Sequence, residues 1–141
     1  MTGSAVPPDE EEQKTALGIG PADLVKDLNT MGLFIETMAV RDLRVYSEAL
    51  DGNVFHYRDS NGLECDAVIH LRNGKYGLLE IKLGGQALIE DGVKTLNAFA
   101  STIDTEKLQA PSFKMILTAV GNLVYNREDG IYVVPISCLR P

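Results

Sequence analysis

The sequence predicts a mixed α/β domain in which a central β-hairpin is flanked by helices. Three observations support this fold class. The chain has 141 residues, a length that suits one domain with a substantial core. Residues 61–85 contain two alternating apolar runs on either side of an Asn73-Gly74 turn signal. Segments with helical spacing of apolar residues precede and follow this hairpin.

Composition places the chain among ordinary globular proteins, since 45% of its residues are hydrophobic. Its net charge of -7 argues against a protein that coats nucleic acid, because phosphate binding normally needs a basic face. We expect no membrane span and no signal peptide, because no apolar run is long enough and the start, MTGSAVPPDEEEQK, is polar. Cys65 and Cys138 are expected to be reduced thiols in a cytoplasmic protein.

The amino-terminal part is expected to change from disorder to helix. Residues 1–15 are polar and acidic, which predicts a disordered tail, so the folded domain should comprise residues 16–141. Pro21 is favourable at the start of a short helix over residues 22–29. A longer helix is expected over residues 32–50. Its apolar face is expected to contain Phe34, Ile35, Met38, Val40, Leu43, Val45 and Tyr46.

The remaining segments predict strands on both sides of one more helix. Gly84-Gly85 ends the hairpin and allows that helix to begin. The expected elements are strand 53–58, the hairpin, helix 86–103, and strands 113–120, 123–125 and 131–134.

The length of the hairpin loop decides which side chains face one another. A two-residue loop would set Ala67 opposite Glu80, whereas a three-residue loop with a left-handed Gly74 would set Asp66 there. We expect the three-residue loop, because it separates an apolar face from an acidic one. The apolar face would then contain Cys65, Ala67, Ile69, Leu71, Gly77, Leu79 and Ile81. The opposite face would gather Glu64, Asp66, Glu80 and Lys82.

This acidic cluster suggests a metal site. Converging carboxylates repel one another, and a shared proton or a hard divalent cation relieves the repulsion. Asp66, Glu80 and the backbone carbonyl of Ile81 could hold Mg²⁺ or Mn²⁺, with Glu36 as a further ligand, direct or through water. Lys82 could orient a nucleophile or stabilise developing negative charge. The chemistry predicted for these residues is metal-assisted hydrolysis of a phosphodiester.

Simpler interpretations of the same residues remain open. Cross-strand acid–lysine pairs are common on solvated sheet faces and contribute about 0.2–1 kcal/mol. Glu36 could face solvent beside Arg41 and Arg44 instead of pointing at the hairpin. Arg58 and Lys94 could contact phosphates together with Lys82, but so few cations predict weak binding at physiological salt.

The histidines and the strand aromatics are weaker candidates. His56 and His70 are expected to be surface residues and not ligands. Phe55, Tyr57 and Tyr76 could stack on bases, although aromatic residues in strands more often belong to the core.

Three segments in order resemble a known family. They are GLFIETMAVRDL (residues 32–43), FHYRDSNGLECDAVI (55–69) and GLLEIKLG (77–84), and the ending VVPISCL (133–139) follows the same pattern. Together they resemble the C-terminal domain, of unknown function, found in prokaryotic AAA-type ATP-binding proteins. The spacing of the acids and the lysine also resembles the PD-(D/E)XK, or restriction-endonuclease-like, core.

The resemblance implies a restriction-endonuclease-like α/β core with Glu36, Asp66, Glu80 and Lys82 at the nuclease-like positions. It implies a Mg²⁺- or Mn²⁺-dependent nuclease acting on DNA or RNA, with the ATPase domain of a full-length protein as partner. The chain contains no G-x-x-x-x-G-K-[ST] loop, so no ATP site is expected in it. The alternative is a catalytically inactive nuclease-fold module for protein interaction or for homo-oligomerisation of the ATPase.

Overall fold

The computed structural model describes residues 21–139 and divides the chain into two compact units, Met1–Leu33 and Phe34–Pro141. In the first unit, the described residues are helical, and the Thr30 hydroxyl donates to the Lys26 carbonyl at 2.9 Å. The tail expected to be disordered, residues 1–15, lies outside the described residues. All candidate site residues belong to the second unit, which is described below.

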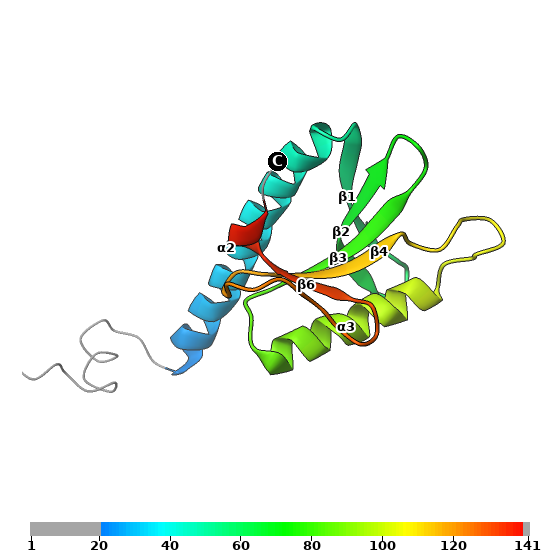
Figure 1. Ribbon diagram of the computed structural model, residues 1–141. Helices are drawn as coiled ribbons and strands as arrows, with labels where there is room; N and C mark the ends of the chain where they lie inside the picture. Colours follow the sequence, from blue (N-terminus) through cyan, green and yellow to red (C-terminus); the bar gives the residue numbers. More distant parts are fainter. Residues whose placement is uncertain (1–20, 140–141) are drawn as a thin grey trace, which may run out of the picture. The chain divides into compact units, whose positions relative to one another are not determined.

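The order of elements confirms an α/β domain with a mixed sheet (Figure 1). The elements are α2 (Pro21–Glu48), β1 (Gly52–Arg58), β2 (Glu64–Leu71), β3 (Tyr76–Lys82), α3 (Gln86–Ser101), β4 (Phe113–Thr118), β5 (Tyr125–Asn126), β6 (Tyr132–Pro135) and the 3₁₀ helix η1 (Ile136–Cys138). Six strands form one sheet in the order β1-β2-β3-β4-β6-β5. Strands β1 to β3 pair antiparallel, β4 lies parallel to both β3 and β6, and β5 pairs antiparallel with β6.

The two helices expected over residues 22–29 and 32–50 are instead one continuous helix, α2. Gly32 lies inside it, where a glycine costs only about 1 kcal/mol relative to alanine and need not end a helix. Neither α2 nor α3 is both long and apolar enough to cross a membrane.

The buried face of α2 differs from the expected one. Ala39, Leu43 and Ser47 are buried at helical spacing, and Ala39 and Leu43 pack in one hydrophobic cluster with side chains of the sheet. The residues expected on the apolar face but found exposed are Phe34, Met38 and Val45. The helix therefore carries a second apolar stripe that faces away from its own sheet.

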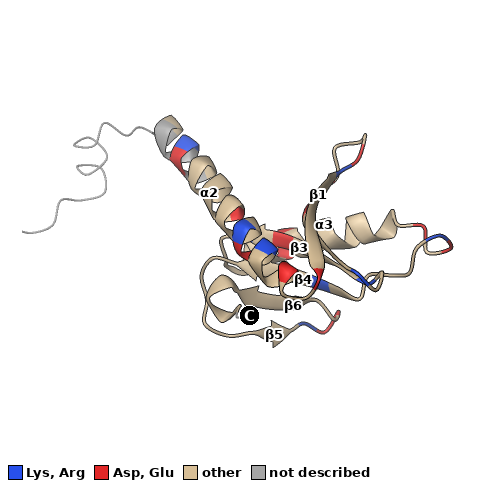
Figure 2. Ribbon diagram, turned by 90° about the horizontal axis from the view of Figure 1, so that it is seen from above, with Lys and Arg blue, Asp and Glu red and all other residues tan. Residues whose placement is uncertain are grey.

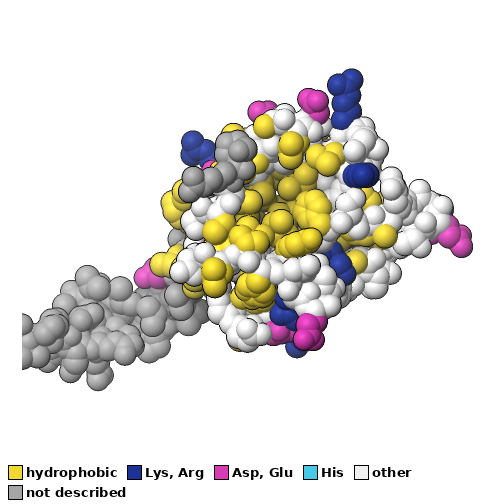
Figure 3. Space-filling model, viewed as in Figure 1, with side chains coloured by type: hydrophobic (Ala, Val, Ile, Leu, Met, Phe, Trp, Pro, Cys, Tyr) yellow, Lys and Arg dark blue, Asp and Glu magenta, His cyan; other side chains and the backbone are white. Residues whose placement is uncertain are grey.

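Side chains on the two faces of the sheet form two separate clusters. Neighbouring Leu78 and Leu79 point to opposite faces, as the alternation of a strand requires. Helix α3 covers the Leu78 face through Ile89, Val93, Leu96 and Phe99. On the Leu79 face, α2 packs through Ala39 and Leu43, and hydrophobic side chains remain visible on the face of the molecule shown in Figure 3.

The three-residue loop of the central hairpin is confirmed. The Leu71 N–H donates to the Lys75 carbonyl at 2.8 Å, and Gly74 has a φ of 88°, in the left-handed region that favours glycine. Ala67 pairs with Leu79 in this register. The next pair along the hairpin is therefore Asp66 with Glu80.

The expected apolar face was wrong at Cys65, because β2 contains an irregularity. Phe55 pairs with Val68, but Tyr57 pairs with Cys65, so β2 uses one more residue than β1 between these two pairs. Such a bulge shifts the alternation of side chains by one. Cys65 therefore packs in the α3 cluster, whereas Ala67 packs in the α2 cluster. Both cysteines are free thiols, with Cys65 buried and Cys138 half-buried.

Candidate functional site

Asp66 and Glu80 lie where the ladder between β2 and β3 opens. The regular pairing ends at Ala67 and Leu79, and side chains then replace backbone carbonyls as acceptors. The Asp66 N–H donates to Glu80 Oε1 at 3.0 Å, and the Ile81 N–H donates to Asp66 Oδ2 at 2.8 Å. Each carboxylate therefore has one oxygen fixed by the backbone of the partner strand. This reciprocal arrangement holds the two acids in a defined orientation.

Glu80 is an acid whose surroundings disfavour its charge. It is only 4% exposed, in the middle of a strand whose other residues are almost all buried. Burial, and next the negative charge of Asp66, raise the pKa of Glu80 to about 8. The Asp66 N–H and the charge of Lys82 oppose this shift without cancelling it. At neutral pH the pair is therefore poised to retain a proton or to accept a cation.

Lys82 and Glu36 complete the group from β3 and α2. An added Cβ at Gly92 of α3 would lie 3.4 Å from Lys82 Cγ, so the missing side chain leaves room for the half-buried lysine stem. The pKa of Glu36 is raised by burial first and by the charge of Asp66 second. Glu36 is therefore close enough to the hairpin for the charge of Asp66 to act on it.

The sequence suggested that Glu64 shares a face with Lys82. In the structure Glu64 lies against β1 instead. Its carboxylate is 3.4 Å from Arg58 Nε and 3.6 Å from His56 Nε2. The bulge in β2 explains this difference, because it turns Glu64 into register with Arg58. Arg58, expected as a phosphate contact, is thus already paired with a surface carboxylate.

His56, expected to be a surface residue and not a ligand, is exposed and lies beside the site. Its Nδ1 lies 3.4 Å from the Asp66 carbonyl, and its charge, when present, lowers the pKa of Glu36. His56 lies beside Asp66 because it stands opposite the bulge in β2. The sequence did not indicate this position, since the bulge has no clear signal in it. Lys94, the other expected phosphate contact, is exposed on α3, and no ion pair joins it to residues 21–139.

The geometry fits a cation held by two carboxylates. Within residues 21–139, no three His, Cys, Asp or Glu side chains converge closely enough to form a metal site by themselves. Mg²⁺ is commonly held by only one or two carboxylates and keeps several waters, so Asp66 and Glu80 suffice for it. The expected part of Glu36 as a further ligand stays a prediction. The structure shows the Ile81 N–H bound to Asp66, and the expected role of the Ile81 carbonyl stays a prediction.

Comparison with known proteins identifies the domain family. No curated protein and no solved structure matches the chain. The family model described as Domain of unknown function (DUF4143) matches residues 31–139. This match spans well over half of the chain and includes α2 from Met31, the entire sheet and α3. The chain therefore belongs to the DUF4143 family.

Proposed function

We propose that this domain is a PD-(D/E)XK-type, restriction-endonuclease-like nuclease that hydrolyses a phosphodiester of DNA or RNA with Mg²⁺ or Mn²⁺. We further propose that it acts as the C-terminal part of an AAA-type ATP-binding protein. The observation that carries the proposal is the reciprocal Asp66–Glu80 arrangement with Lys82 two residues further along β3. A solvated sheet surface would not need two acids held in this way.

The arrangement of elements supports the same proposal. The described chain runs α2-β1-β2-β3-α3-β4, the order of helices and strands that the PD-(D/E)XK resemblance implies. Its acids lie on the central hairpin, at the point where β2 and β3 separate. The first helix of that order carries Glu36, whose pKa is raised by burial first and by the charge of Asp66 second.

The residues of this chain have separate roles in the proposed reaction. Asp66 and Glu80 would hold the cation through the oxygens that the backbone leaves free, and their fixed orientation limits reorganisation during the reaction. When bound, Mg²⁺ would polarise the phosphate and lower the pKa of an attacking water. The Lys82 ammonium would stabilise negative charge that develops on the phosphate oxygens. Glu36 would orient a water in this group.

The test measures cleavage and metal binding on the full chain. We expect Mg²⁺ or Mn²⁺ to support cleavage of single-stranded or branched DNA or of RNA, and calorimetry to detect the metal. Asp66→Asn and Glu80→Gln should abolish both metal binding and cleavage. Lys82→Met should keep metal binding but lower the cleavage rate by about 100-fold or more, as the loss of one charge-stabilising donor typically does.

A matched control distinguishes metal binding at this site from a general effect of removing one negative charge. Glu106→Gln removes an exposed acid from the loop after α3 and should change neither metal binding nor cleavage. Metal binding that survives the Asp66→Asn and Glu80→Gln changes would place the metal elsewhere. Cleavage that persists in those variants at the wild-type rate would show a contaminating nuclease and contradict the proposal.

The second candidate function is a catalytically inactive module for protein interaction or oligomerisation. The exposed stripe on α2 favours it, since Phe34, Met38 and Val45 are 63%, 47% and 61% exposed. Contiguous exposed apolar residues on a helix commonly mark a contact surface. This candidate gains support if the metal test is negative and if polar substitutions on the stripe abolish association with the ATPase domain or with a second copy.

A further inference from the structure

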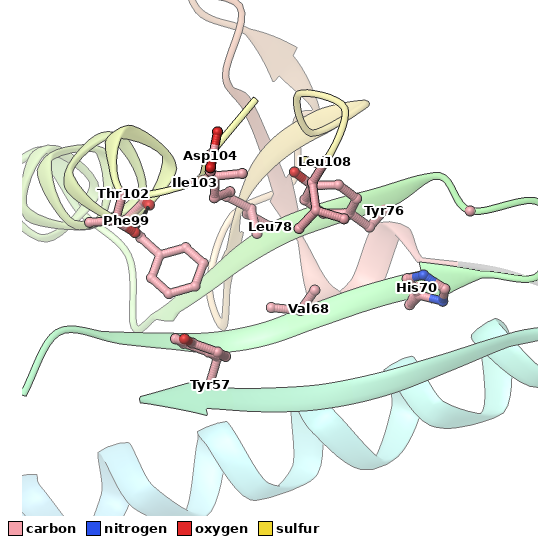
Figure 4. A pocket seen from close by; sticks show the side chains of 11 residues that line it. Tyr57, Val68, His70, Tyr76, Leu78, Phe99, Thr102, Ile103, Asp104 and Leu108 are labelled. Carbon is pink, nitrogen blue, oxygen red and sulfur yellow. Dashed lines mark hydrogen bonds between the residues drawn. The ribbon is translucent and has the colours of Figure 1, made fainter. Parts of the chain in front are cut away.

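A cavity of about 340 Å³ lies on the α3 side of the hairpin and contains none of the proposed catalytic residues. Figure 4 shows it between the strands and the carboxyl end of α3. Its apolar lining includes Tyr57 from β1, Val68 from β2, Tyr76 and Leu78 from β3, Phe99 from α3, and Leu108 from the following loop. We call it the aromatic cavity.

The walls of the aromatic cavity are held in place by specific contacts. The Tyr57 and Phe99 rings meet edge to face with centroids 5.1 Å apart. The Tyr76 hydroxyl donates to the Gln109 carbonyl at 2.6 Å and ties the loop to β3. The Leu108 N–H donates to the Asp104 carbonyl at 2.9 Å, which fixes the turn that carries Leu108. The space is therefore preformed.

The chemistry of the lining suits a flat ring with a polar edge. Aromatic and aliphatic side chains would cover the faces of such a ring, and the volume lies at the lower end of small-ligand sites. Tyr57 and His70 also line the cavity, from opposite ends, and neither side chain forms a hydrogen bond with the described residues. Either one can hydrogen-bond the edge of a nucleobase, and a purely apolar ligand would leave both without a partner.

The position of the cavity suits a nucleic-acid strand that also reaches the carboxylate pair. Val68 pairs with Leu78, two pairs along the hairpin from Asp66 and Glu80, a separation of about 7 Å. The hairpin loop and the loop after α3 border the cavity. These two loops carry three basic residues, Arg72, Lys75 and Lys107, and two acidic residues, Asp104 and Glu106. Their summed charge is therefore +1, whereas the net charge of the chain is -7.

We propose that the aromatic cavity holds one unstacked base of a single-stranded nucleic acid. This inference rests on the proposed function only for the cleavage of the bound strand, because base binding itself requires no metal. It deepens that function by naming single-stranded substrate as the preferred class. A base within a duplex is stacked on both faces and would have to leave its stack to enter the cavity.

The experiment measures binding of a fluorescein-labelled, mixed-sequence 12-nucleotide DNA by anisotropy, with EDTA present so that no cleavage occurs. Tyr57→Ala removes one wall of the cavity, and we expect it to weaken binding about five-fold or more. Leu108→Trp fills the cavity from an exposed loop position and should weaken binding similarly. Tyr125→Ala is the matched control, since Tyr125 is also a strand tyrosine, with 43% exposure against 50% for Tyr57, and does not line the cavity.

Three results would overturn the proposal. These are equal effects of Tyr57→Ala and Tyr125→Ala, equally tight binding of the annealed duplex, or uptake of indole in the cavity without any binding of the oligonucleotide. The last would identify a pocket for an apolar side chain of a protein partner. Thermal unfolding of each variant confirms that it is folded. Because the assay is metal-free, its failure is distinguishable from failure of metal-dependent cleavage.

Discussion

At the scale of single residues, Glu80 is buried at a position where its charge lowers the stability of the fold. A buried carboxylate beside another acid is unfavourable when charged, yet β3 places Glu80 there among Leu79 and Ile81. Two backbone N–H groups reduce this cost by fixing the carboxylates of the pair. An alanine or leucine at position 80 would fill the strand with less electrostatic cost, which argues for a role beyond packing.

The raised pKa of Glu80 predicts that stability falls with pH. The folded state holds the proton up to about pH 8, whereas the unfolded chain releases it near its ordinary value of 4.5. Between these values the folded state binds more protons, so the free energy of unfolding should decrease as pH rises, by about 5 kcal/mol in total. Urea unfolding without metal at intervals from pH 5 to 8.5 measures this.

Glu80→Gln provides the comparison for this pH dependence. The amide is neutral at every pH, so the variant should lose most of the decrease and be more stable than the wild type at pH 8. Glu106→Gln should leave the decrease in place, because that side chain is exposed. A wild-type stability that stays constant from pH 5 to 8 would show that Glu80 is ionised throughout.

At the scale of elements, the close contact between β3 and β4 depends on a missing side chain. Gly77 pairs with Phe113, and an added Cβ at Gly77 would overlap the Phe113 ring. The phenyl ring therefore lies over the glycine and occupies the space of its absent side chain. The parallel pairing of β3 with β4 joins the hairpin, and therefore the candidate site, to the rest of the sheet.

This contact predicts a specific non-additivity. Gly77→Ala should destabilise the protein by about 1–3 kcal/mol, because the ring must move from its place over the strand. In a Phe113→Ala background the same change should cost little, since the space is then free. The measurement is a double-mutant cycle of urea unfolding. Equal costs in both backgrounds would show that the ring and the glycine do not compete for the space.

The elements also show what could be predicted from the sequence. The register of the hairpin was predictable, because Gly74 favours the left-handed conformation and only one loop length separates apolar from acidic residues. The bulge in β2 was not, because it depends on how β1 pairs with Asp66 and Ala67 and leaves no pattern in either strand. The side of Cys65, the partner of Glu64 and the place of His56 all depended on it.

The same reasoning applies to α2. Helical spacing predicted a helix correctly, but two apolar stripes with different residues satisfy that spacing. Packing against the sheet selected the stripe with the small residues Ala39 and Ser47. Which stripe a helix buries depends on the shape of the surface it meets, and single-sequence periodicity does not contain that information.

At the scale of the whole molecule, charge limits how the domain can bind nucleic acid. Acidic and basic residues are interspersed along the described ribbon in Figure 2, and the chain carries 20 acidic against 13 basic residues. If the domain binds nucleic acid as proposed, the affinity would come from a few individual contacts and from stacking, and not from a broad basic surface.

This predicts a shallow salt dependence for single-stranded DNA. If Arg72 and Lys75 supply the main phosphate contacts, the logarithm of the binding constant should fall with the logarithm of salt concentration with a slope of about -1.4. Replacing both by alanine should bring the slope close to zero, whereas Arg44→Ala on α2 should leave it unchanged. Anisotropy titrations from low to physiological salt measure it. A slope several times steeper would reveal an extended cationic footprint elsewhere.

The opening of the ladder at Asp66 and Glu80 also provides two natural reporters. The amide protons of Asp66 and Ile81 are bound to carboxylate oxygens, whereas their neighbours in β2 and β3 belong to the regular ladder. Their NMR chemical shifts and their rates of exchange with deuterium should therefore follow the ionisation of the two acids directly. Any ligand that draws charge from either carboxylate would be recorded at these two amides before it changes the rest of the spectrum.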